Sequence, residues 1–185
     1  MSRALVAASL VLCFIIGIMV GYFFTPEYAM QNERMRSAHD LGPADRYVDL
    51  RYLDNMIAHH QAAIYLLEQA QAHSQRPEIQ ELAQAVIAAD LAEIEELYAY
   101  KRAWYNNTRT VSEFEKVSLG TADARFDLRL LNALLAHHQQ AIDAAMDIST
   151  KSVRNEILDL ADKTATALRA NAEVLEEHRK DWYAL

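Results

Sequence analysis

The chain of 185 residues contains little cysteine, glycine or proline, and each shortage excludes something. Its one cysteine, Cys13, lies in the apolar N-terminal stretch. The rest of the chain therefore has no disulfide, no cysteine-based zinc site and no thiol nucleophile. After residue 43 the strong helix breakers are only Pro77 and Gly120. This scarcity predicts long, uninterrupted helices.

Positive charge is also short, with 18 Lys and Arg against 26 Asp and Glu, a net charge of -8. Because binding to phosphate needs a basic face, this balance argues against a nucleic-acid partner. Sequence signatures of common enzymes are missing as well: Glu-x-x-His, His-Glu-x-x-His, a Gly-rich phosphate loop and the G-x-S-x-G elbow. The sequence therefore favours a role other than catalysis.

The N-terminus carries a long apolar run. Residues 4–24 contain no charge and follow Arg3, and about 20 such residues span a bilayer as a helix. A cleaved signal peptide is the alternative, but its apolar core is usually ~7–15 residues and ends in small residues, which this run lacks. We predict an uncleaved transmembrane anchor at 1–25 and a polar stalk at 26–40. Arg3 favours a cytoplasmic N-terminus, so the remainder would lie outside a bacterial cell membrane.

The sequence after the stalk is duplicated. Shifted by 78 residues (41 to 119), it matches itself without a gap, including Ala58-His59-His60-Gln61 against Ala136-His137-His138-Gln139. Such self-similarity indicates a structural repeat. Repeat 1 covers 41–105, a linker 106–118 and repeat 2 119–183. Each repeat contains two apolar stripes at helical spacing. We predict an all-α four-helix bundle at 41–185, with first helices that start near Pro43 and Thr121 and with the topology left open.

A polar layer interrupts these stripes at mid-height. His60 and His138 occupy positions where the pattern requires Leu or Ile, and Asp90 lies at the midpoint of the next helix. We expect these three to be buried together, with Glu93, His59 and His137 nearby. Burying them is costly unless every member is paired or bound to a metal. A metal would take one histidine from each first helix, completed by Asp90, Glu93 or Met56. Alternatively, the histidines form only a structural hydrogen-bond network.

The segment from Asn55 to Ile64, Asn-Met-Ile-Ala-His-His-Gln-Ala-Ala-Ile, resembles the hallmark of the bacterial family called domain of unknown function 305 (DUF305). The resemblance implies a ferritin-like bundle of two repeated hairpins, usually exported, with some members linked to copper or other metals. By position it implies Met56, His59, His60, His137 and His138 as motif residues. The chain departs from the family pattern at four positions: Asp90 in place of Gln, Leu97 where methionine is common, Leu134 in place of the motif methionine of the second copy, and Asn171 opposite Glu93.

The predicted function combines these features. Imidazole with thioether favours copper, whereas imidazole with carboxylate suits zinc, nickel or iron. With few thioethers, copper is favoured only weakly. We predict a membrane-anchored, extracytoplasmic metal-binding bundle for storage, buffering or resistance. The alternatives are a structural or interaction module without metal and, less favoured, a metal-dependent redox enzyme. The membrane is the predicted partner, through residues 4–24; a homo-oligomer and a protein partner are left open.

Overall fold

The computed structural model describes residues 40–184, which form four long helices. They are α3 (Val48–His73), α4 (Pro77–Tyr105), α5 (Phe126–Ser149) and α6 (Asn155–Tyr183). The predicted all-α class is confirmed. None of these helices is long and apolar enough to cross a membrane. The predicted anchor at 1–25 and the stalk up to residue 39 lie outside the described residues.

The two repeats build the same local structure. Gly42 and Gly120 both have a positive φ, of 71° and 73°, a conformation that glycine adopts at little cost. Next to these turns, Arg51 donates to the carbonyls of Leu41 and Pro43, and Arg129 to those of Leu119 and Thr121. The first helices therefore begin at Val48 and Phe126, later than predicted. The turns and their arginine contacts occupy the residues that we expected to be helical.

Reciprocal arginine contacts join the two hairpins. Arg76 of the first repeat lies 3.3 Å from Asp127 and stacks over Trp182 of the second. At the equivalent positions, Arg154 of the second repeat lies 3.4 Å from Asp49 and stacks over Trp104 of the first. Each arginine thus binds the other hairpin in the same way, and the hairpins are related by an approximate two-fold axis.

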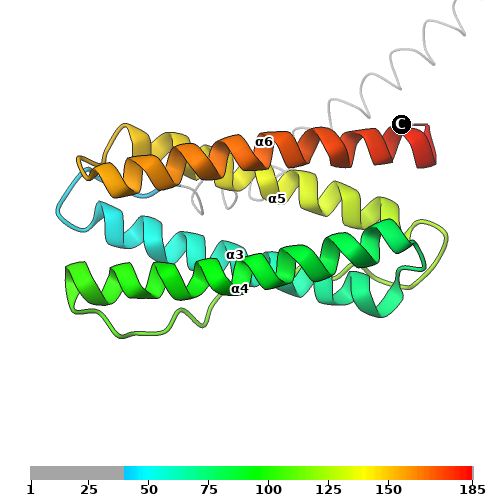
Figure 1. The fold of residues 1–185 in the computed structure, drawn as a ribbon, viewed down its shortest axis with the longest axis horizontal. Helices are drawn as coiled ribbons and strands as arrows, with labels where there is room; N and C mark the ends of the chain where they lie inside the picture. Colours follow the sequence, from blue (N-terminus) through cyan, green and yellow to red (C-terminus); the bar gives the residue numbers. More distant parts are fainter. Residues whose placement is uncertain (1–39, 185) are drawn as a thin grey trace, which may run out of the picture. The chain divides into compact units, whose positions relative to one another are not determined.

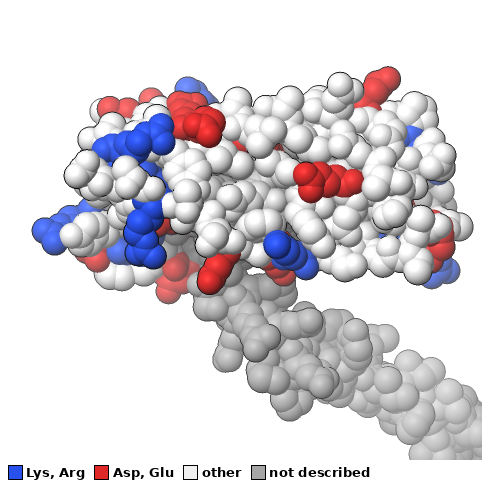
Figure 2. Space-filling model, turned by 90° about the horizontal axis from the view of Figure 1, so that it is seen from below, with Lys and Arg blue, Asp and Glu red and all other residues white. Residues whose placement is uncertain are grey.

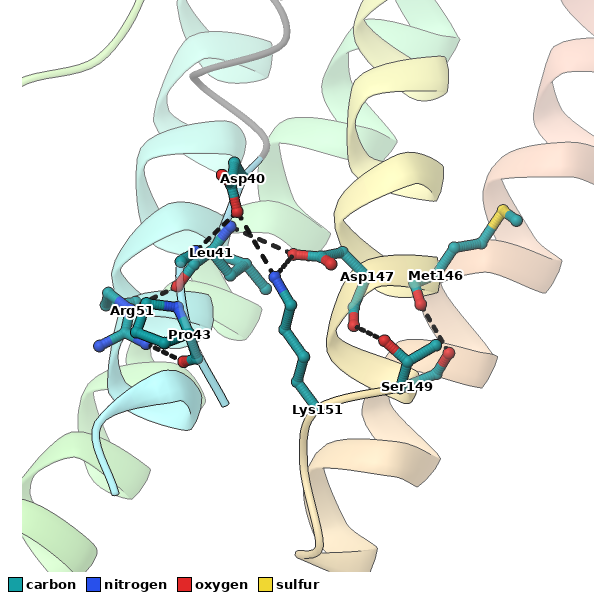
Figure 3. Close-up of polar contacts among 10 residues, drawn as sticks. Asp40, Leu41, Pro43, Arg51, Met146, Asp147, Ser149 and Lys151 are labelled. Carbon is teal, nitrogen blue, oxygen red and sulfur yellow. Dashed lines mark hydrogen bonds and ion pairs between the residues drawn. The ribbon is translucent and has the colours of Figure 1, made fainter. Parts of the chain in front are cut away.

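A further contact fixes the first described residues to the second hairpin. Lys151 lies 2.8 Å from Asp147 and 3.4 Å from Asp40, while the Leu41 amide donates to Asp147 at 3.1 Å (Figure 3). The same figure shows Arg51 reaching the carbonyls of Leu41 and Pro43. The residues that precede α3 are therefore attached to the end of α5 as well as to their own hairpin.

The linker between the repeats lies along α3 and decides the topology. Gln61 and Gln69 of α3 donate to the carbonyls of Val111 and Val117, at 3.1 and 3.0 Å. Lys101, only 1% exposed, holds the start of the linker through the carbonyl of Arg109. Because the linker returns along α3, α5 begins where α3 ends and runs antiparallel to it (Figure 1).

The hairpins contact each other mainly through their first helices. α3 packs against both α4 and α5, and α5 packs against α6. α4 and α6 lie at opposite edges of the bundle, with α3 and α5 between them (Figure 1). Two apolar cores form at this interface, and each takes residues from both repeats. The second helices remain apart, and this separation creates the space described next.

Candidate functional site

A groove of about 1000 Å³ lies between α4 and α6. Its floor is formed by α3 and α5, and its walls by α4 and α6. The residues that line it include all seven residues predicted to form the site: Met56, His59, His60, Asp90, Glu93, His137 and His138. The fold therefore brings the two His-His pairs to one place. His60 and His137 are buried, but all four histidines border the space of the groove.

His60 lies between two carboxylates in the groove. Its Nδ1 lies 2.9 Å from Oδ1 of Asp90, and its Nε2 lies 3.2 Å from Oε2 of Glu93. Asp90 is 7% exposed and His60 8%, while 52% of the Glu93 side chain is exposed. Both carboxylates come from α4, one turn apart, so α3 and α4 together fix the orientation of the ring.

The charges of this group follow from its contacts. Burial lowers the pKa of His60, but the hydrogen bonds and charges of Asp90 and Glu93 outweigh it and raise the pKa to about 9. Burial raises the pKa of Asp90, against the opposing effect of His60. The hydrogen bond from His60 lowers the pKa of Glu93. Without metal, His60 is therefore a cation between two carboxylates at neutral pH.

His59 and His137 stack on each other at the centre of the floor. Their ring centroids are 3.7 Å apart and their planes differ by 4°. They occupy equivalent positions in the two repeats, so the approximate two-fold axis passes between them. A helix inside a bundle has two neighbours: position 60 of α3 faces α4, while position 59 faces α5. The apolar spacing identified the first of these faces and missed the second.

The second repeat consequently differs from the prediction. We expected His138 to be buried with His60 and Asp90, but the buried histidine of α5 is His137, at 7% exposure. His138 is only partly buried. In the second repeat, Leu168 and Asn171 occupy the positions of Asp90 and Glu93. His138 therefore has no carboxylate partner at these positions of α6. Burial lowers the pKa of His138 to about 4, and its Nδ1 has no hydrogen-bond partner among the described residues.

The groove also contains residues that the sequence did not single out. Five further carboxylates line it, against one lysine, Lys163; they are Glu78, Glu81, Glu96, Glu156 and Asp159. His178 is half-buried and lines the groove as well. By contrast, the face of the molecule in Figure 2 carries scattered charges of both signs on a largely uncharged surface. The groove therefore carries an excess of carboxylates over cationic side chains, which attracts cations.

No preformed metal cage exists among residues 40–184: no three His, Cys, Asp or Glu side chains converge on one point. Both nitrogens of His60 face carboxylates. The stacked rings of His59 and His137 cannot share an ion, since an imidazole binds metal in its own plane. Met56 lines the groove but is 1% exposed, and its counterpart is Leu134. An ion would therefore have to displace a proton from one of these histidines or bind the neutral His138.

The comparisons with known proteins agree with this picture. Residues 49–126 match the family described as "Domain of unknown function (DUF305)". This confirms the family resemblance. Among proteins with curated annotation, none matches the chain. The fold resembles solved structures of CopM. The Cu(I)-bound form matches with a TM-score of 0.63 and 26% identity, covering 71% of this chain and 95% of that one.

Other forms of CopM match equally well. The apo form has a TM-score of 0.63 and 27% identity, covering 71% of this chain and 96% of that one. An Ag-bound form obtained by co-crystallization also has a TM-score of 0.63 and 27% identity, with coverages of 71% and 95%. The described helices therefore have the fold of a protein that has been solved both with and without copper or silver.

Proposed function

We propose that this protein binds a transition-metal ion as cargo in the groove between α4 and α6, for storage, buffering or resistance. The observation that carries the proposal is that two His-His pairs, one from each repeat, line a single open groove with an excess of carboxylates. Imidazole and carboxylate are established ligands of transition metals. The likeness to CopM, which has been solved with Cu(I) and Ag, supports the same class of ligand.

The test measures metal content and thermal stability together on the full-length protein. A ligand that binds only the folded state raises the melting temperature, so Cu(II), Zn(II), Ni(II) or Fe(II) should do so in the parent. The double variant His60→Leu/His138→Leu should lose the bound ion and stay folded, because leucine restores the apolar pattern. His73→Gln is the control, since His73 is exposed at the end of α3. The proposal would be refuted if the parent contains no metal and its melting temperature does not change when any of the four ions is added.

One alternative has specific support: the histidines serve only as a structural network. The contacts of His60 with Asp90 and Glu93 are what this alternative expects. It predicts no bound metal in the parent. It also predicts that His60→Leu alone lowers the free energy of unfolding by about 1–3 kcal/mol, because Asp90 loses its buried partner. His60→Leu should lose this contact under either function, so the metal content of the parent separates the two.

We also propose that residues 4–24 anchor the protein in a bacterial membrane, with the helical domain on the extracytoplasmic side. The support is the uncharged run itself and Arg3 before it. The protein should fractionate with membranes, and intact-mass analysis should find residues 4–24 retained. A mature N-terminus near residues 25–35 would contradict the anchor without affecting the metal proposal.

A further inference from the structure

The two carboxylates that contact His60 lie in different surroundings. Asp90 is buried and faces Nδ1 at 2.9 Å. Glu93 faces Nε2 at 3.2 Å, and about half of its side chain is exposed. Both residues line the groove, but the Glu93 side of the ring is the accessible one. The ring of His60 thus has one nitrogen held in the interior and one directed at a carboxylate that an ion can reach.

A histidine that binds a metal usually donates its other ring N–H to a carboxylate, which fixes the orientation of the ring. Asp90 and His60 have this arrangement already. Nitrogen and oxygen ligands bind zinc at about 2.0–2.2 Å, so two ligands of one ion lie about 3 Å apart. The 3.2 Å between His60 Nε2 and Glu93 Oε2 agrees with that spacing.

From this geometry we infer that the ion binds at His60 Nε2 and Glu93, and that Asp90 is a positioning residue rather than a ligand. The inference rests on the proposed function and makes it specific. The ion replaces the proton on Nε2 of His60, which leaves to solvent, and Glu93 gives up its contact with Nε2 to bind the same ion. A nitrogen and oxygen donor pair suits divalent ions such as Zn(II), Ni(II) or Cu(II).

The duplication provides an independent argument. The repeats share their turns, their arginine contacts and their histidines, yet both carboxylates are missing from the second copy. There, Leu168 replaces the positioning residue and Asn171 replaces the exposed ligand. In agreement, Nδ1 of His138 has no hydrogen-bond partner in the described part of the chain. The chain should therefore bind one ion at this kind of site, between α3 and α4, and lack the equivalent between α5 and α6.

The experiment titrates Zn(II) and Cu(II) into the metal-free, full-length protein and its variants. Glu93→Gln removes a ligand and should raise Kd at least tenfold. Asp90→Asn should raise Kd about 10–100-fold. The electron paramagnetic resonance spectrum of Cu(II) bound to this variant should indicate the same number of ligands as in the parent. Glu95→Gln, on an exposed position outside the groove, is the charge-matched control and should leave Kd unchanged.

A gain-of-site variant completes the test. Leu168→Asp/Asn171→Glu restores both carboxylates beside His138 and should raise the stoichiometry from one ion to two. Nitrogen chemical shifts with Zn(II) should identify Nε2 of His60 as the ligand atom in the parent. An ion that binds Glu93→Gln as tightly as the parent would overturn this inference and leave the proposed function standing. A parent that binds no ion would overturn both.

Discussion

The metal-free protein should lose stability on both sides of about pH 6.5, through two different histidines. His60 binds its proton more tightly in the folded state, because its pKa rises from 6.5 to about 9. Its contribution is therefore complete below pH 6.5 and disappears as the pH rises to about 9. His138 binds its proton less tightly when folded, because its pKa falls to about 4. Its contribution is complete above pH 6.5 and disappears as the pH falls to about 4.

The size of each effect follows from the change in pKa. At roughly 1.4 kcal/mol for each pKa unit, the rise from 6.5 to about 9 corresponds to about 3 kcal/mol for His60. The fall in the pKa of His138 from 6.5 to about 4 corresponds to a similar change in the free energy of unfolding, but with the opposite dependence on pH. These contributions are large for a domain whose total stability is about 5–15 kcal/mol. The free energy of unfolding should therefore be greatest near the pH at which free histidine titrates.

Urea denaturation from pH 4.5 to 9.5, with a chelator present, measures these effects. His60→Gln should abolish the decline between pH 6.5 and 9 and keep the decline on the acidic side. His138→Gln should reduce the acidic decline between pH 6.5 and 4.5 and keep the alkaline one. If His60→Gln declines above pH 6.5 as steeply as the parent, the assignment of the raised pKa to the Asp90 and Glu93 contacts is wrong.

Two further predictions concern the framework around the groove. Asp54→Ala leaves the buried Lys101 without its ion-pair partner, 2.5 Å away, and should cost about 3 kcal/mol of unfolding free energy. Asn132→Ala, the equivalent change in the second repeat, affects only an exposed contact with Arg179 and should cost less than about 0.5 kcal/mol; equal losses would contradict the structure. Arg76→Ala and Arg154→Ala each remove one ion pair and one contact with tryptophan. Each should cost about 1 kcal/mol in urea denaturation, and clearly unequal costs would argue against the two-fold relation.

Much of the fold was predictable because it depends on local patterns. The scarcity of glycine and proline, the apolar spacing and the offset of 78 residues together predicted four helices in two equivalent hairpins. The same patterns did not correctly predict where the first helix of each repeat begins. The helices were predicted to start near Pro43 and Thr121. Instead, the carboxylates of Asp45 and Asp123 pair with Arg51 and Arg129 in turns that precede the helices.

The site was predictable in composition but not in arrangement. Two His-His pairs at mid-helix indicated a shared polar site, and the carboxylates of α4 fell at the same height. The spacing could not show that α4 and α6 stand apart, because a periodic pattern gives the direction of a face and not the distance to its neighbour. Nor could it show that His59 stacks on His137, which depends on how closely α3 and α5 approach.

The most direct measurement is a crystal structure of the metal-loaded protein with anomalous diffraction collected at the absorption edge of the ion. The account predicts one strong anomalous peak in the groove, within bonding distance of His60 Nε2 and Glu93, with Asp90 still hydrogen-bonded to His60 Nδ1. A peak away from the groove histidines, or an empty groove at saturating metal, would contradict the central claim that this groove is built to hold a transition-metal ion.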